Sequence, residues 1–315
     1  MKCVFLLASA YGFECLKRVM VDGYVEVVGI ITTHKRFKLV YGKGKEKIMR
    51  NLVYDDIYHM AKDNGIFVYE ISRMNSVETI SAISALTPDI LVVSGWYHLI
   101  GKSILDIPRL GVLALHASYL PYYRGGAPLV WQIINDEKYA GISLFYMDEG
   151  VDSGDIVEQE RILINEDDDI SSLYSRVGSI GIKMLADSLE KISNGIVIRK
   201  KQPIIDDMDV YPQREPADGH INWTASSRQI FNFVRAQTHP YPGAFSYIGH
   251  TKIYVWKCSI VNDVVQNVLP GTVIDIEQET FWVSCGEKGL IKILDYSIEN
   301  DDRKMTVINK GTVLN

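Results

Sequence analysis

The feature of this sequence that most constrains its fold is an alternation of short apolar runs with amphipathic helical segments, which extends from the amino terminus to about residue 192. Apolar, strand-like runs occupy residues 2–9, 25–33, 66–71, 89–94 and 111–115, and helical patterns occupy residues 13–22, 55–65, 76–86 and 171–192. Continuous apolar strands are typical of a parallel sheet that is covered by helices on both faces. We therefore predict an α/β fold with a doubly wound, Rossmann-like and mostly parallel sheet.

The pattern changes after about residue 197, which indicates a second domain. Polar turns lead into one helical segment at residues 226–237 and then into short strands at 244–248, 252–256, 271–276, 281–284 and 290–298. Short strands separated by glycine-containing turns favour a small β-barrel-like, OB-like domain. We predict a first domain over residues 1–203 and a C-terminal domain over 204–315. The strand edges of such a barrel favour a homodimer.

Composition excludes several classes of protein. Hydrophobic residues make up 47% and charged residues 23% of the 315 residues, as in ordinary globular proteins. The net charge of −6 argues against a protein that grips nucleic acid over its whole surface. No apolar run approaches the roughly 20 residues of a membrane span, and the amino-terminal run is too short for a signal peptide. The four cysteines lack metal-binding spacing. We expect a cytoplasmic protein that binds no metal and has no membrane partner.

A basic, glycine-containing insert follows the second predicted strand, at residues 33–47. Charged runs of this kind are usually mobile, solvated loops, and this is the favoured interpretation. The alternative is a lid or anion-binding loop for a substrate that carries phosphate.

The residues that suggest chemistry lie at the ends of two successive strands. His116 follows the buried strand at 111–115, and the acidic loop that contains Asp152 follows the strand at 142–147. Ligands of open α/β sheets bind outside the carboxyl ends of the strands. A carboxylate beside a histidine favours the imidazolium and orients the ring, which suits proton transfer. On spacing alone, a hydrogen-bonded core histidine explains His116 equally well.

Two segments resemble the folate-dependent formyltransferase family. They are HASYLPYYRGGAPLVWQIINDE and GISLFYMDEGVDSGDIV, which match the family pattern at His116, Ser118, Leu120, Pro121, Tyr123, Arg124, Gly125, Asp152, Gly154 and Asp155. The resemblance continues to Trp223 and to residues 235–245, so that it covers nearly the whole chain. It implies an enzyme whose first domain binds 10-formyltetrahydrofolate.

The resemblance also implies roles for individual residues. His116 would assist proton transfer, and Asp152 would tune His116 and help deprotonate the attacking amine. The pterin would lie against Gly95, Trp96, Tyr97, Leu99, Ile100, Leu120, Asp148, Gly150 and Asp152. The acceptor substrate would contact Ser118, Tyr123 and Arg124.

One catalytic position departs from the family. Ala114 stands where the family has an asparagine that donates a hydrogen bond to the formyl oxyanion. Loss of one such donor typically costs ~10²- to 10³-fold in rate. Three explanations remain open: another donor has replaced the asparagine, the residue was engineered, or the chain binds folate or nucleotide without efficient catalysis.

The identity of the formylated amine is the least constrained inference. The segment Gly95–Ile100 and the run at residues 238–245 resemble the sugar-nucleotide enzymes more than the tRNA enzymes of this family. We therefore expect the acceptor to be a nucleotide-linked amino sugar of lipopolysaccharide or O-antigen biosynthesis, with nucleic acid disfavoured. The alternative acceptor is methionyl-tRNA, for which the basic insert and the basic pair Lys200 and Lys201 would contribute the binding face.

Overall fold

The computed structural model describes residues 1–41, 45–205, 210–262, 267–299 and 308–315, which form two compact units. Unit 1 comprises Met1–Gly125, Gly141–Ile162 and Val177–Val210. Unit 2 comprises Gly126–Ala140, Leu163–Arg176 and Tyr211–Asn315. Unit 2 thus takes in two segments that precede residue 203, and the simple domain boundary between residues 203 and 204 stays a prediction.

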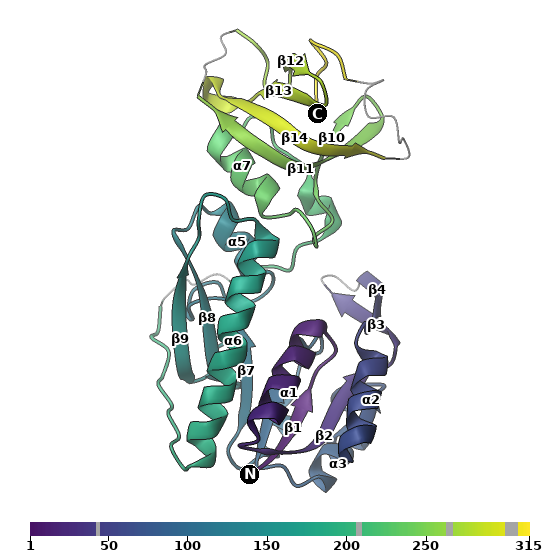
Figure 1. Cartoon of the computed structure of the whole chain (residues 1–315), viewed down its shortest axis with the longest axis vertical. Coiled ribbons are helices and arrows are strands. Elements are labelled where there is room, and N and C mark those ends of the chain that lie inside the picture. Colours follow the sequence, from purple (N-terminus) through teal and green to yellow (C-terminus); the bar gives the residue numbers. More distant parts are fainter. Residues whose placement is uncertain (42–44, 206–209, 263–266, 300–307) are drawn as a thin grey trace. The chain divides into compact units, whose positions relative to one another are not determined.

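The core of unit 1 is a mostly parallel sheet (Figure 1). In spatial order its strands are β5 (Phe67–Ile71), β2 (Glu26–Thr33), β1 (Lys2–Leu6), β6 (Ile90–Val93), β7 (Val112–His116), β8 (Tyr139–Tyr146) and β9 (Ile156–Leu163). The pairs from β5 to β7 are parallel, whereas β8 runs antiparallel to β7. The predicted Rossmann-like fold class is confirmed.

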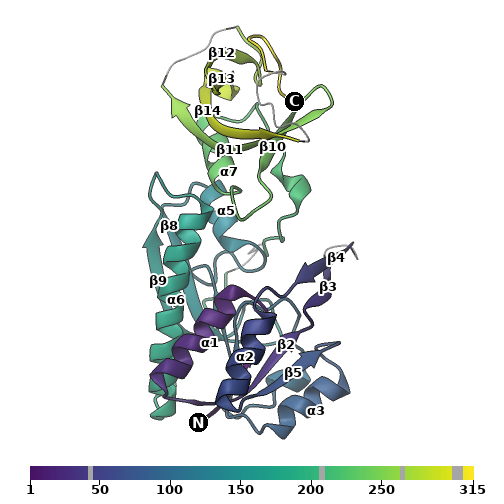
Figure 2. The same ribbon diagram turned by 45° about the vertical axis from the view of Figure 1, so that its right-hand side comes forward.

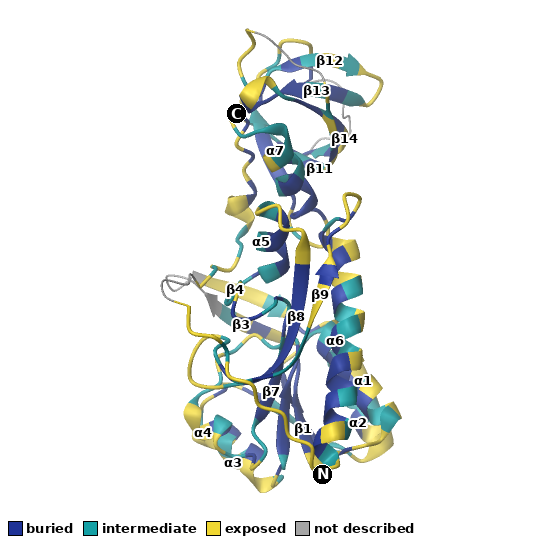
Figure 3. Ribbon diagram, turned by 90° about the vertical axis from the view of Figure 1, so that its left-hand side faces the viewer, coloured by how far each residue is buried: buried dark blue, intermediate teal, exposed yellow. Residues whose placement is uncertain are grey.

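Helices cover both faces of this sheet. Figure 3 shows α1 (Ala10–Asp22), α2 (Tyr54–Asn64) and α6 (Ile170–Ser193) on one face and α3 (Val77–Ala85) and α4 (Lys102–Leu105) on the other. The central strands β1, β6 and β7 are buried, as their continuous apolar runs predicted, whereas the edge strands β5 and β9 are only partly buried. Helix α1 starts three residues before the predicted segment because the Ser9 side chain caps it by accepting a hydrogen bond from the Gly12 N–H.

The basic insert is a β-hairpin, so the prediction of a loop was wrong. Strands β3 (Arg36–Tyr41) and β4 (Lys45–Arg50) pair antiparallel, while residues 42–44 of the insert lie outside the described part of the chain. The aromatic ring of Phe37 is buried, whereas Arg36 and Lys38 on either side of it are exposed. This is the period-2 alternation of a strand, which is hard to recognise among so many charges.

Unit 2 contains a five-stranded antiparallel sheet (Figure 2). Its strands follow the order β10 (Ala244–Ile248), β11 (Thr251–Val261), β14 (Leu290–Ile298), β13 (Thr280–Ser284) and β12 (Val273–Glu277). Ile230 and Val234 of helix α7 (Ser227–Arg235) belong to the same apolar core as these strands. The unit also contains α5 (Pro128–Ile134) and the 3-10 turns η1 (Pro216–Gly219) and η2 (Gly286–Lys288). The predicted short C-terminal strands are confirmed, and the structure shows that they pair antiparallel.

Candidate active site

The carboxyl ends of β1, β6 and β7 meet at one edge of the sheet, because these three strands are parallel neighbours. The loops that follow β1 and β6 touch each other: the Ala8 N–H donates to the Gly95 carbonyl at 3.2 Å. Gly95 has φ of 58°, and a Cβ atom there would lie 1.7 Å from the Ser9 hydroxyl. Only glycine fits this close approach, so the turn after β6 has a fixed course beside the amino terminus of α1.

His116 is the last residue of β7 and its side chain is nearly buried, with 10% exposed. Its Nε2 lies 2.8 Å from the carbonyl oxygen of Tyr123, and its Nδ1 lies 3.5 Å from the Asp152 carboxylate. Because a carbonyl can only accept, Nε2 carries the proton in this arrangement. The imidazolium form is the one that presents an N–H to both partners. The structure thus brings the two predicted catalytic side chains together, and their catalytic roles stay a prediction.

Asp152 reaches His116 by a different route from the one predicted. We expected two successive strand ends at one edge, but β8 is antiparallel to β7, with Tyr146 opposite Leu113 and Ser143 opposite His116. The loop after β8 therefore starts at the far end of β7 and returns to His116. Gly154 permits this course, because a Cβ atom there would lie 1.7 Å from the Tyr146 carbonyl oxygen.

The Asp152 loop is held by the backbone and by one distant side chain. The Asp152 carboxylate accepts from the Gly125 N–H at 2.9 Å. The side-chain amide of Gln202 donates to the carbonyls of Asp152 and Gly154, each at 2.8 Å. The φ angle of Asp152 is 48°, a left-handed conformation that is costly for a residue with a side chain and is frequent at functional sites. Sequence reasoning missed Gln202, since nothing in the pattern around it signals this contact.

Ala114 occupies the expected place but provides no donor. It lies two residues before His116, so both side chains point to the same face of β7. Ala114 is 7% exposed and belongs to an apolar core with Val4, Leu6 and Leu120. A methyl group therefore stands where the family asparagine would offer an amide.

The segment predicted to bind the pterin follows β6 and presents free backbone groups. Within the described residues, no hydrogen bond is recorded for the backbone of residues 96–98, whereas Leu99 O and Gly101 N are both held by the Asn75 side chain. The edge of a pterin is rich in donors and acceptors and fits such unpaired backbone groups. Tyr97 and Leu99 are exposed and Leu120 is buried. Contact of these residues with the cofactor stays a prediction.

The second predicted pterin-binding segment forms a fixed turn. The Asp148 carboxylate accepts from the Gly150 N–H at 3.1 Å and from the Ser153 hydroxyl at 2.7 Å. A Cβ atom at Gly150 would lie 2.0 Å from the Ser153 hydroxyl oxygen, so glycine lets this hydroxyl keep its hydrogen bond to Asp148. Residues 148–151 are exposed, so this turn is accessible to a ligand.

The three residues predicted to contact the acceptor have different surroundings. Ser118 is fully buried and its hydroxyl donates to the Tyr122 carbonyl at 2.6 Å, so it stabilises its own loop, and its contact with the acceptor stays a prediction. Tyr123 contributes its carbonyl to His116. Arg124 donates from Nη2 to the Gln202 amide oxygen at 2.5 Å.

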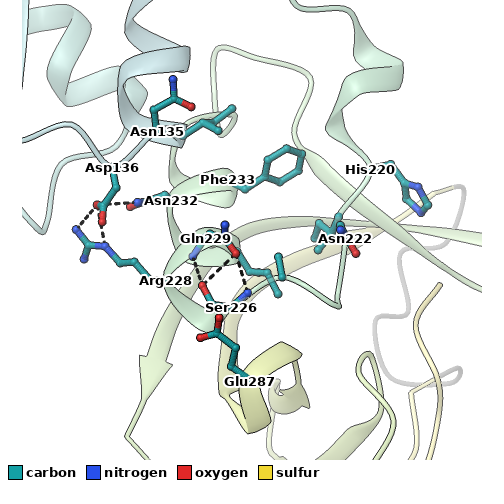
Figure 4. Close-up of a pocket in the computed structure, with 14 residues that line it drawn as sticks. Asn135, Asp136, His220, Asn222, Ser226, Arg228, Gln229, Asn232, Phe233 and Glu287 are labelled. Carbon is teal, nitrogen blue, oxygen red and sulfur yellow. Dashed lines mark hydrogen bonds and ion pairs between the residues drawn. The ribbon is translucent and has the colours of Figure 1, made fainter.

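Two cavities lie away from the His116–Asp152 pair. One, of about 630 Å³ in unit 1, lies at the base of the hairpin and is lined by His34, Lys35, Arg36, Arg50, Asn51, Leu52, Tyr54, Asp55 and Glu70. The other, of about 610 Å³, lies in unit 2 (Figure 4). Its carboxylate Asp136 accepts from Arg228 at 2.7 Å and from Asn232 at 2.8 Å, so these charges already satisfy each other. Neither cavity contains a residue of the predicted catalytic set.

No group of three or more potential ligands gathers in a way that could hold a metal ion within the described ranges. Nor is any helix of the described chain long and apolar enough to cross a membrane.

Comparison with known proteins identifies the family. A model named formyl transferase matches residues 7–189, and a model of the formyl transferase C-terminal domain matches residues 214–309. Methionyl-tRNA formyltransferase of Acetivibrio thermocellus is 32% identical over 308 residues, which cover 98% of this chain and 94% of that protein. The enzyme of the same name from Thermodesulfovibrio yellowstonii is 33% identical over 253 residues, covering 80% and 78%.

Solved structures share the fold at lower identity. WlaRD, a sugar 3N-formyl transferase solved with dTDP and 5-N-formyl-THF, has a TM-score of 0.65 and 19% identity, covering 96% of this chain and 98% of that one. The N-formyltransferase of Helicobacter canadensis has a TM-score of 0.62 and 19% identity, covering 93% and 98%. With both family models matched along most of its length, the chain belongs to the formyl transferase family, a family of enzymes that use formyl-tetrahydrofolate.

Proposed function

We propose that this enzyme transfers the formyl group of 10-formyltetrahydrofolate to the amino group of methionyl-tRNA. The observation that carries the proposal is the similarity to methionyl-tRNA formyltransferases, at 32% identity over 98% of this chain. The likeness to sugar N-formyltransferases is 19% identical and concerns the fold alone. The order of preference from the sequence, with the sugar nucleotide first, is therefore reversed.

The hairpin supports a polyanionic acceptor. Arg36 and Arg50 lie directly opposite each other in the β3–β4 pair, and both are exposed. Neither has an ion pair among the described residues. Like charges at facing positions destabilise a hairpin, and a bound phosphate would turn this repulsion into attraction. Lys35 and Lys38, at the start of this hairpin, pair with single carboxylates at 2.6 and 2.9 Å, so the two arginines are among the hairpin cations that no carboxylate of the described chain pairs with.

The hairpin also adjoins the segment predicted to hold the formyl donor. The ring of Phe37 lies 5.6 Å from the ring of Tyr97 and 5.8 Å from that of His98. Burial in this aromatic group lowers the pKa of His98, so that it is a neutral packing residue at physiological pH. A phosphate backbone held by Arg36 and Arg50 would therefore run beside residues 96–98.

In the proposed reaction the methionyl nitrogen attacks the formyl carbon. A C–N bond forms to the acceptor, the bond from carbon to N10 of the folate breaks, and the proton lost by the amine ends on N10. Asp152 and His116 lie 3.5 Å apart and provide a path for that proton. The buried position of His116 limits exchange of this proton with water.

The test is formyl transfer with purified protein, 10-formyltetrahydrofolate and either methionyl-tRNA or a panel of dTDP-, UDP- and GDP-linked amino sugars. We expect turnover with methionyl-tRNA that falls steeply as salt is raised. Turnover with a sugar nucleotide and none with methionyl-tRNA would overturn the proposal and restore the other acceptor class.

Replacing Arg36 and Arg50 together by glutamine should raise KM for methionyl-tRNA at least fivefold and flatten the salt dependence, with little change in KM for the folate. Lys191→Gln, which removes an exposed cation from helix α6, is the matched control. Equal effects of the two changes would show that the hairpin has no specific part in binding.

A further inference from the structure

The site needs a hydrogen-bond donor that Ala114 cannot supply. In the proposed reaction, on which this inference rests, the formyl oxygen becomes negatively charged when the amine attacks. A preorganised donor at that oxygen is usually the largest single contribution to catalysis in acyl transfer. The space beside Ala114 is lined by apolar side chains, so the donor has to come from another element of the site.

The two residues that flank Arg124 in the chain hydrogen-bond to His116 and Asp152. The residue before it, Tyr123, accepts from His116 Nε2 at 2.8 Å, and the N–H of the residue after it, Gly125, donates to the Asp152 carboxylate at 2.9 Å. The φ angles of Tyr123 and Gly125 are 57° and 96°. Two left-handed residues thus bracket Arg124 and fix its Cα beside the two side chains.

The Arg124 guanidinium is tied to the same loop through Gln202. The Arg124 Nη2 donates to the Gln202 Oε1 at 2.5 Å, while the Gln202 Nε2 donates to the carbonyls of Asp152 and Gly154 at 2.8 Å. The amide of Gln202 therefore fixes the guanidinium against the Asp152 loop. A guanidinium is planar and always charged, so its N–H groups keep fixed directions relative to one another and to the nitrogen that Gln202 holds.

One of those N–H groups lacks an acceptor. The Arg124 Nε is buried from solvent and has no hydrogen-bond partner in the described structure. Native proteins pair nearly all buried donors, and an exception in a functional site calls for an unbound partner. The cost of leaving a charged donor unpaired is recovered when a ligand oxygen completes the group.

We propose that Arg124 supplies the N–H donor to the formyl oxygen that the family asparagine would have supplied from position 114. The guanidinium and the asparagine amide then stabilise the same oxyanion from different sides. Arg124 and an asparagine at position 114 are then alternative donors to one oxygen. The effect on kcat of losing Arg124 should therefore depend on which residue occupies position 114.

The experiment is a double-mutant cycle between Arg124→Gln and Ala114→Asn. In the native background Arg124→Gln should lower kcat ~10²- to 10³-fold, the usual effect of losing an oxyanion donor. In the Ala114→Asn background the same change should cost less than tenfold, because the restored amide serves the oxygen. KM for 10-formyltetrahydrofolate should change less than threefold. Added guanidinium ion at millimolar concentration should recover part of the activity of Arg124→Gln alone.

Equal losses in the two backgrounds would overturn the proposal and leave Arg124 a structural residue. Trp96 provides the second overturning result, because its buried indole N–H also lacks a partner in the described structure. If Trp96→Phe, and not Arg124→Gln, shows a loss that Ala114→Asn relieves, the indole is the donor. Lys201→Gln, which removes an exposed neighbour of Gln202, should change kcat less than twofold. Where Arg124→Gln melts early, Arg124→Lys keeps the charge and removes the fixed Nε direction.

The cycle is measured with methionyl-tRNA and also with water as acceptor, by release of formate from 10-formyltetrahydrofolate. Both reactions form the same oxyanion. If the loss of formate release in Arg124→Gln depends on the residue at position 114, and no formyl group reaches methionyl-tRNA, the result supports Arg124 as the donor and rejects the proposed acceptor. If Arg124→Gln lowers kcat equally with alanine and with asparagine at position 114, while methionyl-tRNA is formylated, the acceptor is supported and Arg124 is rejected as the donor.

Discussion

The substitution Asp152→Asn removes the negative charge of this side chain and keeps its shape and position. The carboxylate lies 3.5 Å from His116 Nδ1 and accepts a hydrogen bond from the Gly125 N–H. An asparagine keeps an oxygen for that N–H, so the loop has no reason to move. It loses the negative charge that stabilises the imidazolium. The change therefore isolates the electrostatic part of the pair.

The magnitude follows from the separation. Two unit charges 3.5 Å apart attract each other by about 5 kcal/mol at an effective dielectric constant of 20. The Asp152 side chain is 22% exposed, so water screens part of this attraction and about 3 kcal/mol is a fair expectation. Since each 1.36 kcal/mol is tenfold in rate, kcat should fall on the order of 10²-fold.

The assay is single-turnover formation of tetrahydrofolate with saturating donor, together with thermal unfolding of each variant. Asp155→Asn is the control, since Asp155 lies in the same loop and pairs with exposed Lys201 at 3.3 Å. We expect a loss below twofold for the control and unchanged unfolding temperatures for both. A loss below fivefold for Asp152→Asn would refute the reasoning, because the charge at 3.5 Å would then do little for His116.

Three further substitutions test contacts inside each of the two units. Gly154→Ala should abolish activity, since its Cβ would lie 1.7 Å from the carbonyl oxygen of the last residue of β8, whereas Gly195→Ala, with nothing within 4 Å, should leave activity intact; turnover assays compare them. Arg235→Met should lower the free energy of unfolding in urea by about 3 kcal/mol, because the buried guanidinium donates to three backbone carbonyls, whereas the exposed pairs of Arg228 should contribute below about 1 kcal/mol. Burial raises the pKa of Glu70, but hydrogen bonds from two tyrosines and a histidine outweigh it and lower the pKa overall. Glu70 thus stabilises the fold above about pH 4.3 and loses this effect as the pH falls, so Glu70→Gln should flatten the acid side of the urea-stability profile.

The sheet of unit 1 was predictable because burial on both faces leaves a strong mark on the sequence. Val4 and Leu6 of β1 are fully buried, and so are Leu91 of β6 and Leu113 of β7. Such strands are apolar throughout and stand out from the helices between them. The β3–β4 hairpin leaves no such mark, since one buried ring, that of Phe37, lies among exposed charges. Its strands are visible only in the pairing of the backbone.

The pairing of His116 with Asp152 was predicted from a wrong topology, and this shows what a motif can and cannot specify. The motif placed His116 and Asp152 in one site, and the structure places them 3.5 Å apart. The apolar run of β8 does not reveal whether the strand lies parallel or antiparallel to β7, because the side-chain pattern of a buried strand is the same in both cases. Gln202 was beyond prediction for a related reason. Its two hydrogen bonds reach residues about 50 positions earlier, and only the folded chain brings them together.

The net charge of −6 argues against a protein that binds nucleic acid over its whole surface, but it does not bear on a local basic site such as the hairpin. At physiological ionic strength charges are screened beyond about 8 Å. A phosphate group therefore responds to the cations within that distance and hardly to the acidic residues elsewhere on the chain. Arg36 and Arg50 face each other on adjacent strands with no ion pair among the described residues, so a phosphate there would meet two cations that no carboxylate pairs with. Total charge bounds solubility and long-range steering, so it cannot by itself decide between tRNA and a sugar nucleotide as the acceptor.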